Sequence, residues 1–129
     1  IMPFKKRSEC SPEEALQYLQ DYFATVDLVA EALSKFETLA TDSTTASQRS
    51  LYRAKTLEAE RDLELLKNKR RAFLNEQAAI QPPTPAMVKE AEERAQKLAE
   101  VDASEAKANA IIDILTKGLE AFNEVHQAS

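Results

Sequence analysis

Three prolines within four positions, Pro82, Pro83 and Pro85, interrupt a chain that is otherwise rich in Ala, Glu, Leu and Lys. Proline has no N–H for the helical hydrogen-bond ladder, and it disfavours helical geometry in the residue before it. One helix must therefore end before Pro82, and another can begin at Pro85 with Thr84 as its N-cap. The tight turns of sheets need glycine, but the chain has only Gly118. The sequence therefore predicts an all-α fold.

The first helix is predicted over residues 11–41. Ser11 can cap it, Pro12 suits its first position, and Glu14 can complete a capping box with Ser11. Apolar residues then recur at steps of three and four, as on one face of a helix. These residues are Ala15, Leu19, Tyr22, Val26, Val29, Leu33, Phe36 and Ala40. Further apolar positions widen this face, as a globular core requires. They are Leu16, Phe23 and Ala30.

Two further helices are predicted over residues 45–80 and 85–127, on either side of the prolines. Thr45 can cap the second helix through a capping box. Inside the third helix, Asp102 and Glu105 have the spacing of a second capping pair, so the sequence predicts a point near Asp102 where this helix can break. Glu105 also falls on the apolar face of the third helix.

Short connections between long amphipathic helices place neighbouring helices antiparallel. The predicted architecture is therefore an elongated, up-down-up three-helix bundle. Residues 1–10 form an N-terminal arm, and residues 11–129 form a single bundle domain. A chain of 129 residues, of which 43% are hydrophobic, is long enough to bury one core of this kind.

The lone cysteine, Cys10, permits no disulfide within the chain and fits a reducing compartment. The opening residues 1–10 include basic side chains but lack the following apolar run of a secretory signal. No stretch of ~18 apolar residues is present, so the sequence predicts no membrane-spanning helix. We therefore expect a cytoplasmic protein without a membrane partner.

Four basic residues lie within five positions of a chain whose net charge is −5. They are Lys67, Lys69, Arg70 and Arg71. Residues 11–44 carry a net −6 and residues 86–129 a net −4, whereas residues 53–71 carry +3. This segregation favours ion pairs from Lys67 or Arg71 to acids of the first or third helix. The alternative is a partner-binding patch for an acidic protein or a phosphate. Four cations in an acidic chain do not predict nucleic-acid binding.

The C-terminal half of the third helix carries more apolar residues than one neighbouring groove can cover. Self-association is therefore predicted through this surface, because monomers rarely leave large apolar patches exposed. The residues concerned are Ile111, Ile114, Leu115 and Phe122. We expect a homodimer in which this half-helix packs against its two-fold mate. The alternative is that the N-terminal arm covers the same surface with Met2 and Phe4.

The sequence contains few residues that could support catalysis. His126 is the only histidine and lies near the C-terminus, where we expect it to fray. There is no Glu-x-x-His motif of a carboxylate-bridged metal site, no Gly-rich phosphate loop, and no marked acid and base pair. Tyr18, Tyr22 and Tyr52 lie on or near core faces, which favours a packing role. We therefore predict no cofactor and no metal.

The segment RDLELLKNKRRAFLNEQ, residues 61–77, resembles the first helix of helical chorismate mutases, where a leucine-rich turn precedes an active-site arginine. A second arginine is available as Arg53. That family also needs a lysine about three turns further on, and this chain has AAIQPP there. The resemblance therefore assigns no family.

These features predict a non-enzymatic helical protein–protein interaction module, such as an adaptor, a chaperone-like protein or a small regulatory protein. One alternative is a small helical-bundle enzyme or ligand-binding domain with its site inside the bundle, around Arg53, Arg70 and the tyrosines. Another alternative is a phage or mobile-element structural protein. A polar cluster buried in a pocket would favour the enzyme.

Overall fold

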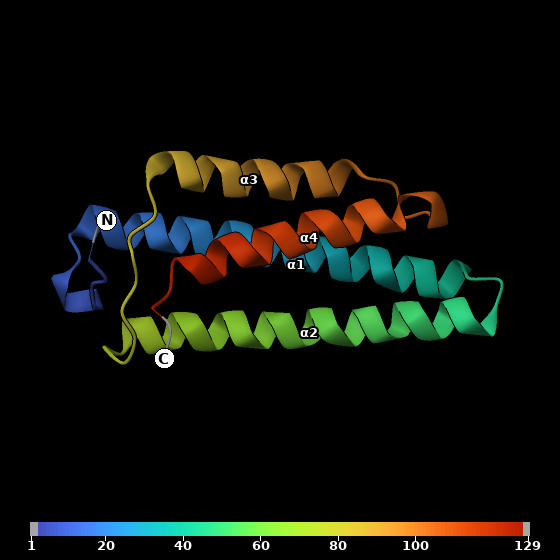
Figure 1. Cartoon of the computed structure of the whole chain (residues 1–129), viewed down its shortest axis with the longest axis horizontal. Helices are drawn as coiled ribbons and strands as arrows, with labels where there is room; N and C mark the ends of the chain where they lie inside the picture. Colours follow the sequence, from blue (N-terminus) through green and yellow to red (C-terminus); the bar gives the residue numbers. More distant parts are fainter. Residues whose placement is uncertain (1–2, 128–129) are drawn as a thin grey trace.

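The computed structural model describes residues 3–127, and this part of the chain contains four α-helices and two short 3-10 helices. Their bounds are η1 (Arg7–Glu9), α1 (Pro12–Asp42), α2 (Ala46–Leu74), α3 (Pro85–Glu100), η2 (Glu105–Lys107) and α4 (Ala108–Glu124). α2 runs antiparallel to α1, α3 lies along α1 in the same direction, and α4 returns toward the start of α1 (Figure 1). The all-α prediction is confirmed. The three-helix prediction is wrong, because the third predicted helix is two helices.

The predicted helix starts are confirmed to within one residue. The Ser11 hydroxyl accepts a hydrogen bond from the Glu14 N–H at 3.0 Å, and the Glu14 carboxylate accepts one from the Ser11 N–H at 2.8 Å. Thr45 and Thr84 cap α2 and α3 through their hydroxyls, which accept from backbone N–H groups three residues later. Such caps satisfy donors that a first helical turn leaves unpaired, and each stabilises a helix by about 1 kcal/mol.

The predicted break near Asp102 is present, and there the chain reverses direction. α3 ends at Glu100, Val101 is extended, and η2 then leads directly into α4. A continuous helix over 85–127 would extend well beyond α1, whose 31 residues span about 46 Å. The reversal instead brings the apolar stripe of α4 back against α1, where it is buried. Tyr52 donates a hydrogen bond to Glu105 at this turn, which gives that carboxylate a partner beside the core.

α2 ends at Leu74, six residues before the predicted boundary. Glu76 has a φ of 63°, and the Gln77 N–H donates to the Ala72 carbonyl at 2.8 Å. This is the Schellman arrangement that terminates many helices. Ile80 therefore leaves the helix, and it is fully buried in the extended crossover to α3.

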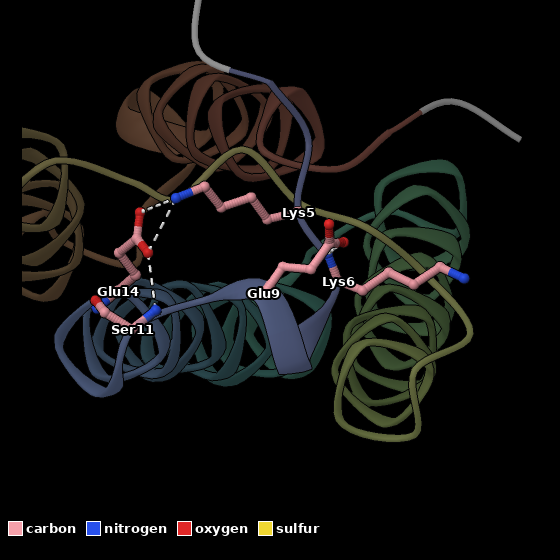
Figure 2. A network of polar contacts seen from close by, with 5 residues as sticks. All are labelled: Lys5, Lys6, Glu9, Ser11 and Glu14. Carbon is pink, nitrogen blue, oxygen red and sulfur yellow. Dashed lines mark hydrogen bonds and ion pairs between the residues drawn. The ribbon is translucent and has the colours of Figure 1, made fainter.

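The N-terminal arm and the C-terminus both pair with this crossover. Lys5 and Ile80 exchange two backbone hydrogen bonds, at 2.6 and 2.8 Å, and the Val125 carbonyl accepts from Gln81 at 2.7 Å. The Lys5 ammonium also lies 3.0 Å from the Glu14 carboxylate at the start of α1 (Figure 2). Together with the Ser11 N–H, which is the largest contribution, this ammonium lowers the pKa of Glu14.

The arm therefore closes the end of the bundle where α1 and α3 begin. Phe4, which was one candidate to cover the apolar half of the third predicted helix, is 38% exposed. Met2, the other candidate, lies outside the described residues.

α1 is the central helix, because it packs against α2, α3 and α4. Its close contact with α4 is made at Gly118. A Cβ built at Gly118 would lie 2.1 Å from Leu28 Cδ2 and 3.7 Å from Arg94 Cδ. Leu28 is only 1% exposed, so its side chain has little space into which it can move. The absence of a side chain at this position therefore sets the distance between α4 and α1.

We predict that Gly118→Ala lowers the free energy of unfolding by about 1–3 kcal/mol, because overpacking a filled core forces neighbours to shift. Alanine favours a helix by about 1 kcal/mol over glycine. A fall in the free energy of unfolding despite this preference would therefore show that the added methyl group clashes with Leu28. In a Leu28→Ala background the clashing atom is gone, and the same substitution should be neutral or stabilising. Urea unfolding of the four proteins in this cycle measures the effect. Equal effects of Gly118→Ala in both backgrounds would contradict the assignment.

Candidate functional site

An aromatic cluster that includes the only histidine fills the core near the C-terminus. The ring centroid of Tyr18 lies 4.5 Å from that of Phe73 and 5.8 Å from that of Phe122, while the His126 ring lies 4.7 Å from Phe122. Tyr18 is fully buried. His126 is therefore half-buried against the edge of the core and held there by these contacts, so the prediction that it frays is wrong. The physical reason is the backbone pairing of the C-terminus with the crossover, which holds this segment in place.

The hydrogen bonds of His126 fix its tautomer. Its Nδ1 lies 3.0 Å from the Phe122 carbonyl oxygen, which can only accept, so Nδ1 carries the proton. Nε2 then accepts from the Tyr18 hydroxyl at 2.7 Å. Burial lowers the pKa of His126 to about 4 and raises the pKa of Tyr18, so both groups are neutral at pH 7.

The residues proposed for a site inside the bundle are only partly brought together. The Arg70 guanidinium carbon lies 5.0 Å from the ring centroid of Tyr22, close to Tyr18, and its buried Nε has no hydrogen-bond partner. Arg53 is exposed, and Tyr52 lies at the other end of the bundle beside η2. Tyr22 is 3% exposed, so its contact with Arg70 is a cation–π packing contact at the edge of the core.

Of the basic patch, Arg70 contacts Tyr22 of α1, whereas Lys67 and Arg71 make their contacts within α2. Lys67 pairs with Glu64 at 3.7 Å, and Arg71 donates to the Asn68 side chain at 3.2 Å. Within residues 3–127, neither Lys67 nor Arg71 forms an ion pair with α1 or α3, so the predicted cross-helix pairs are wrong. Both residues are exposed on the flank of α2, away from its buried positions. Lys69 borders a groove of about 340 Å³ between α2 and α4. The use of this patch by a partner remains a prediction.

The residues chosen for self-association are buried within one chain. Ile111 is fully buried, and the exposed fractions of Ile114, Leu115 and Phe122 are 9%, 8% and 1%. They are covered because α4 folds back along α1, whereas the prediction assumed a single long helix. The self-association predicted on these side chains therefore loses its physical reason.

An open groove of about 570 Å³ runs between α1 and α3. Its walls combine alanines, acids and one aromatic side chain. They are Gln20, Phe23, Ala24, Asp27, Ala30, Glu31, Glu92, Ala95, Gln96 and Ala99. Phe23 is 54% exposed, with its ring edge-on to Tyr22 at 5.3 Å between centroids. This groove joins an uncovered apolar surface to a rim of negative charge.

Local sequence explains the shape and the charge of this groove. Alanines on both facing helices fill little of the space between α1 and α3, so the groove stays open. Asp27, Glu31 and Glu92 are its charged walls, and all three are acids. Lys35, near one end, donates to the Ala99 carbonyl of α3 at 3.3 Å. The sequence interpretation placed Phe23 on the apolar face of its helix and did not find the groove, although the alanine spacing in both helices was visible.

Comparison of the chain with protein families, curated proteins and solved structures finds no match. Within the described residues, no helix is both long enough and apolar enough to cross a membrane. The same part of the chain contains no group of three His, Cys, Asp or Glu side chains arranged to hold a metal ion.

We predict that His126 makes the protein less stable in acid. Its pKa is about 4 in the folded state and 6.5 in the unfolded chain, so the unfolded state takes up the proton first. Stability should fall as the pH falls from about 6.5 to 4, with a slope of at most ~1.4 kcal/mol per pH unit. His126→Gln should remove this dependence in urea unfolding.

Asp21 provides the opposite sign and serves as the control. It is 5% exposed, and burial raises its pKa to about 6, partly offset by Arg94. Between these pKa values the Asp21 carboxyl is protonated in the folded protein and ionised in the unfolded chain. The contribution of Asp21 to the stability of the protein is therefore lost as the pH rises from about 3.8 to 6. Asp21→Asn should therefore steepen the acid loss that His126 causes. A wild-type profile unchanged by His126→Gln would contradict the assignment.

Proposed function

We propose that this protein is a non-enzymatic helical protein–protein interaction module whose partner binds in the groove between α1 and α3. The observation that carries the proposal is the groove itself, with alanine walls, an exposed Phe23 and a rim of acids. Parallel helices separated by small side chains form a receptor for a third helix, which packs its ridge of side chains between them.

The chemistry of the groove specifies the partner. The lining of α1 spans residues 20–31, or about 16 Å, which corresponds to three turns of helix. Phe23 and the alanines favour an apolar stripe on the partner, and the acids favour Lys or Arg beside that stripe. A basic amphipathic helix of about three turns fits both requirements.

The alternative of a ligand site inside the bundle has less support. The Tyr18 hydroxyl already donates to His126, and the rings around it are closely packed. What favours a ligand there is the buried Nε of Arg70, the side-chain atom that lacks a hydrogen-bond partner within residues 3–127. A cytoplasmic location and the absence of a nucleic-acid partner remain part of this proposal, as the sequence predicts them. Self-association also remains a proposal, on a different surface from the one predicted.

Selection from a phage-displayed library of helical peptides tests the groove. We expect selected sequences to carry apolar residues at helical spacing with Lys or Arg beside them. A synthetic selected peptide should bind at least tenfold more weakly to Phe23→Asp, because a hydrated carboxylate then replaces the apolar surface that contacts the apolar stripe of the peptide. Binding measured by isothermal calorimetry should also weaken with added salt.

Leu16→Asp is the matched control, because Leu16 is 55% exposed on the same helix and lies outside the groove lining. This variant should bind the peptide as the wild type does. Peptides that bind both variants equally, or a library that yields no binder, would reject the groove as the partner site.

A further inference from the structure

The outward face of α2 carries a second pattern that the fold does not use. Eight positions at alternating steps of four and three have the spacing of coiled-coil contact positions on this face, and four of them are apolar. They are Ser47, Leu51, Ala54, Glu58, Arg61, Leu65, Asn68 and Ala72, here called the outer α2 seam. The core face of α2 is a separate set, namely Tyr52, Ala59, Leu66 and Phe73.

The outer α2 seam is open to solvent. Leu51 and Leu65 are 49% and 50% exposed, and Leu57 beside them is 63% exposed. The other seam residues are exposed except Ala72, which is half-buried. α2 forms one edge of the molecule in Figure 1, with no helix beyond it in this view. The exposed leucines leave room for a second helix along the seam, beside the groove that Leu65 lines together with Leu119 of α4.

An antiparallel copy of the seam matches its own sequence. With the two-fold axis midway between Glu58 and Arg61, each Glu58 faces Arg61 of the second copy. In the same register Ala54 faces Leu65, so a small residue meets a large one on both sides of the axis. Charge is thus complementary next to the axis, and side-chain size is complementary one step further out. The two outer pairs are Leu51 with Asn68 and Ser47 with Ala72.

The residues that flank the seam agree with this register. Lys55 and Asp62 flank the seam on one side and meet across the axis with opposite charges, while Leu57 and Glu64 meet on the other side. Glu58 is now paired with Lys55 at 3.3 Å in an exposed contact, which costs little to rearrange. A parallel pairing would instead place Glu58 against Glu58 and Arg61 against Arg61, which disfavours it.

We propose that the outer α2 seam is a self-association surface, on which a second copy of this chain packs its own α2 antiparallel about a two-fold axis between Glu58 and Arg61. This surface is separate from the groove between α1 and α3, so it does not depend on the proposed function. The polar residues at its centre set the register and limit the affinity, so the association is reversible.

Charge exchange tests the pairing. Glu58→Arg or Arg61→Glu alone places like charges across the axis, and each should weaken dimerisation in sedimentation equilibrium at least tenfold. The double variant Glu58→Arg with Arg61→Glu restores opposite charges and should recover the dimer. Glu60→Arg makes the same charge change at an exposed position outside the seam, and it should leave the dimer unchanged. Circular dichroism verifies that each variant is folded.

Cysteine cross-linking tests the direction of pairing, in a Cys10→Ala background. Ala54 and Leu65 lie about 16 Å apart on one helix, too far for a disulfide within a chain. The double variant Ala54→Cys with Leu65→Cys should form covalent dimers under mild oxidation, whereas Ala54→Cys alone should not. Dimers of the single variant would indicate parallel pairing and overturn the proposal.

The sedimentation experiment also distinguishes a two-fold dimer from other ways in which a second chain could cover this face. A limiting mass of two chains that follows the charge exchange supports the proposal. A mass that keeps growing with concentration would indicate that α2 of one copy binds in the acidic groove of the next. Such a contact does not close on itself, so it adds chains without limit. That result, or a monomer up to millimolar concentration, would overturn it.

Discussion

The close approach of α4 to α1 at Gly118 is the contact on which the rest of the structure depends. Leu28 occupies the space that any side chain at this position would need. Because α4 lies so close, its apolar stripe is buried by α1 within the same chain, and Ile111 and Phe122 become core residues. The reversal after Glu100 is useful only if this contact is possible. The single glycine of the chain thus permits the close approach that buries α4 once the chain has reversed.

Residues near both ends of the chain form backbone hydrogen bonds with one extended segment, the crossover between α2 and α3. Ile80 pairs with Lys5 on one side and with His126 on the other, and its side chain is fully buried. This pairing holds the C-terminus where His126 can accept from Tyr18. The Schellman end of α2 at Glu76 is what releases Ile80 from the helix. Loss of this helix end would therefore disturb the histidine and the N-terminal arm together.

The features that could be predicted from sequence are those determined by neighbouring residues. Ser11 and Thr84 predict helix starts because a cap needs only the next turn. The sequence predicted a possible break near Asp102, but whether the chain kinks or reverses there depends on what the following helix packs against. Periodicity likewise placed Phe23 on an apolar face without showing that it would remain exposed beside a groove. Surfaces for partners arise from the faces that packing leaves uncovered, and local patterns do not determine these faces.

The two proposed surfaces lie on different sides of α1, since the groove is formed with α3 and the seam belongs to α2 (Figure 1). Neither occupant would therefore displace the other. A two-fold pair through the seam would present two grooves related by the same axis. A partner with two basic helices, or a partner that is itself a dimer, would then bind through both grooves, and the second contact would form within the same complex. Linked binding of this kind strengthens attachment without any new contact, provided that the spacing of the two partner helices matches that of the grooves. A weak seam is sufficient for this purpose, because a bivalent partner and the pairing of the two chains stabilise each other.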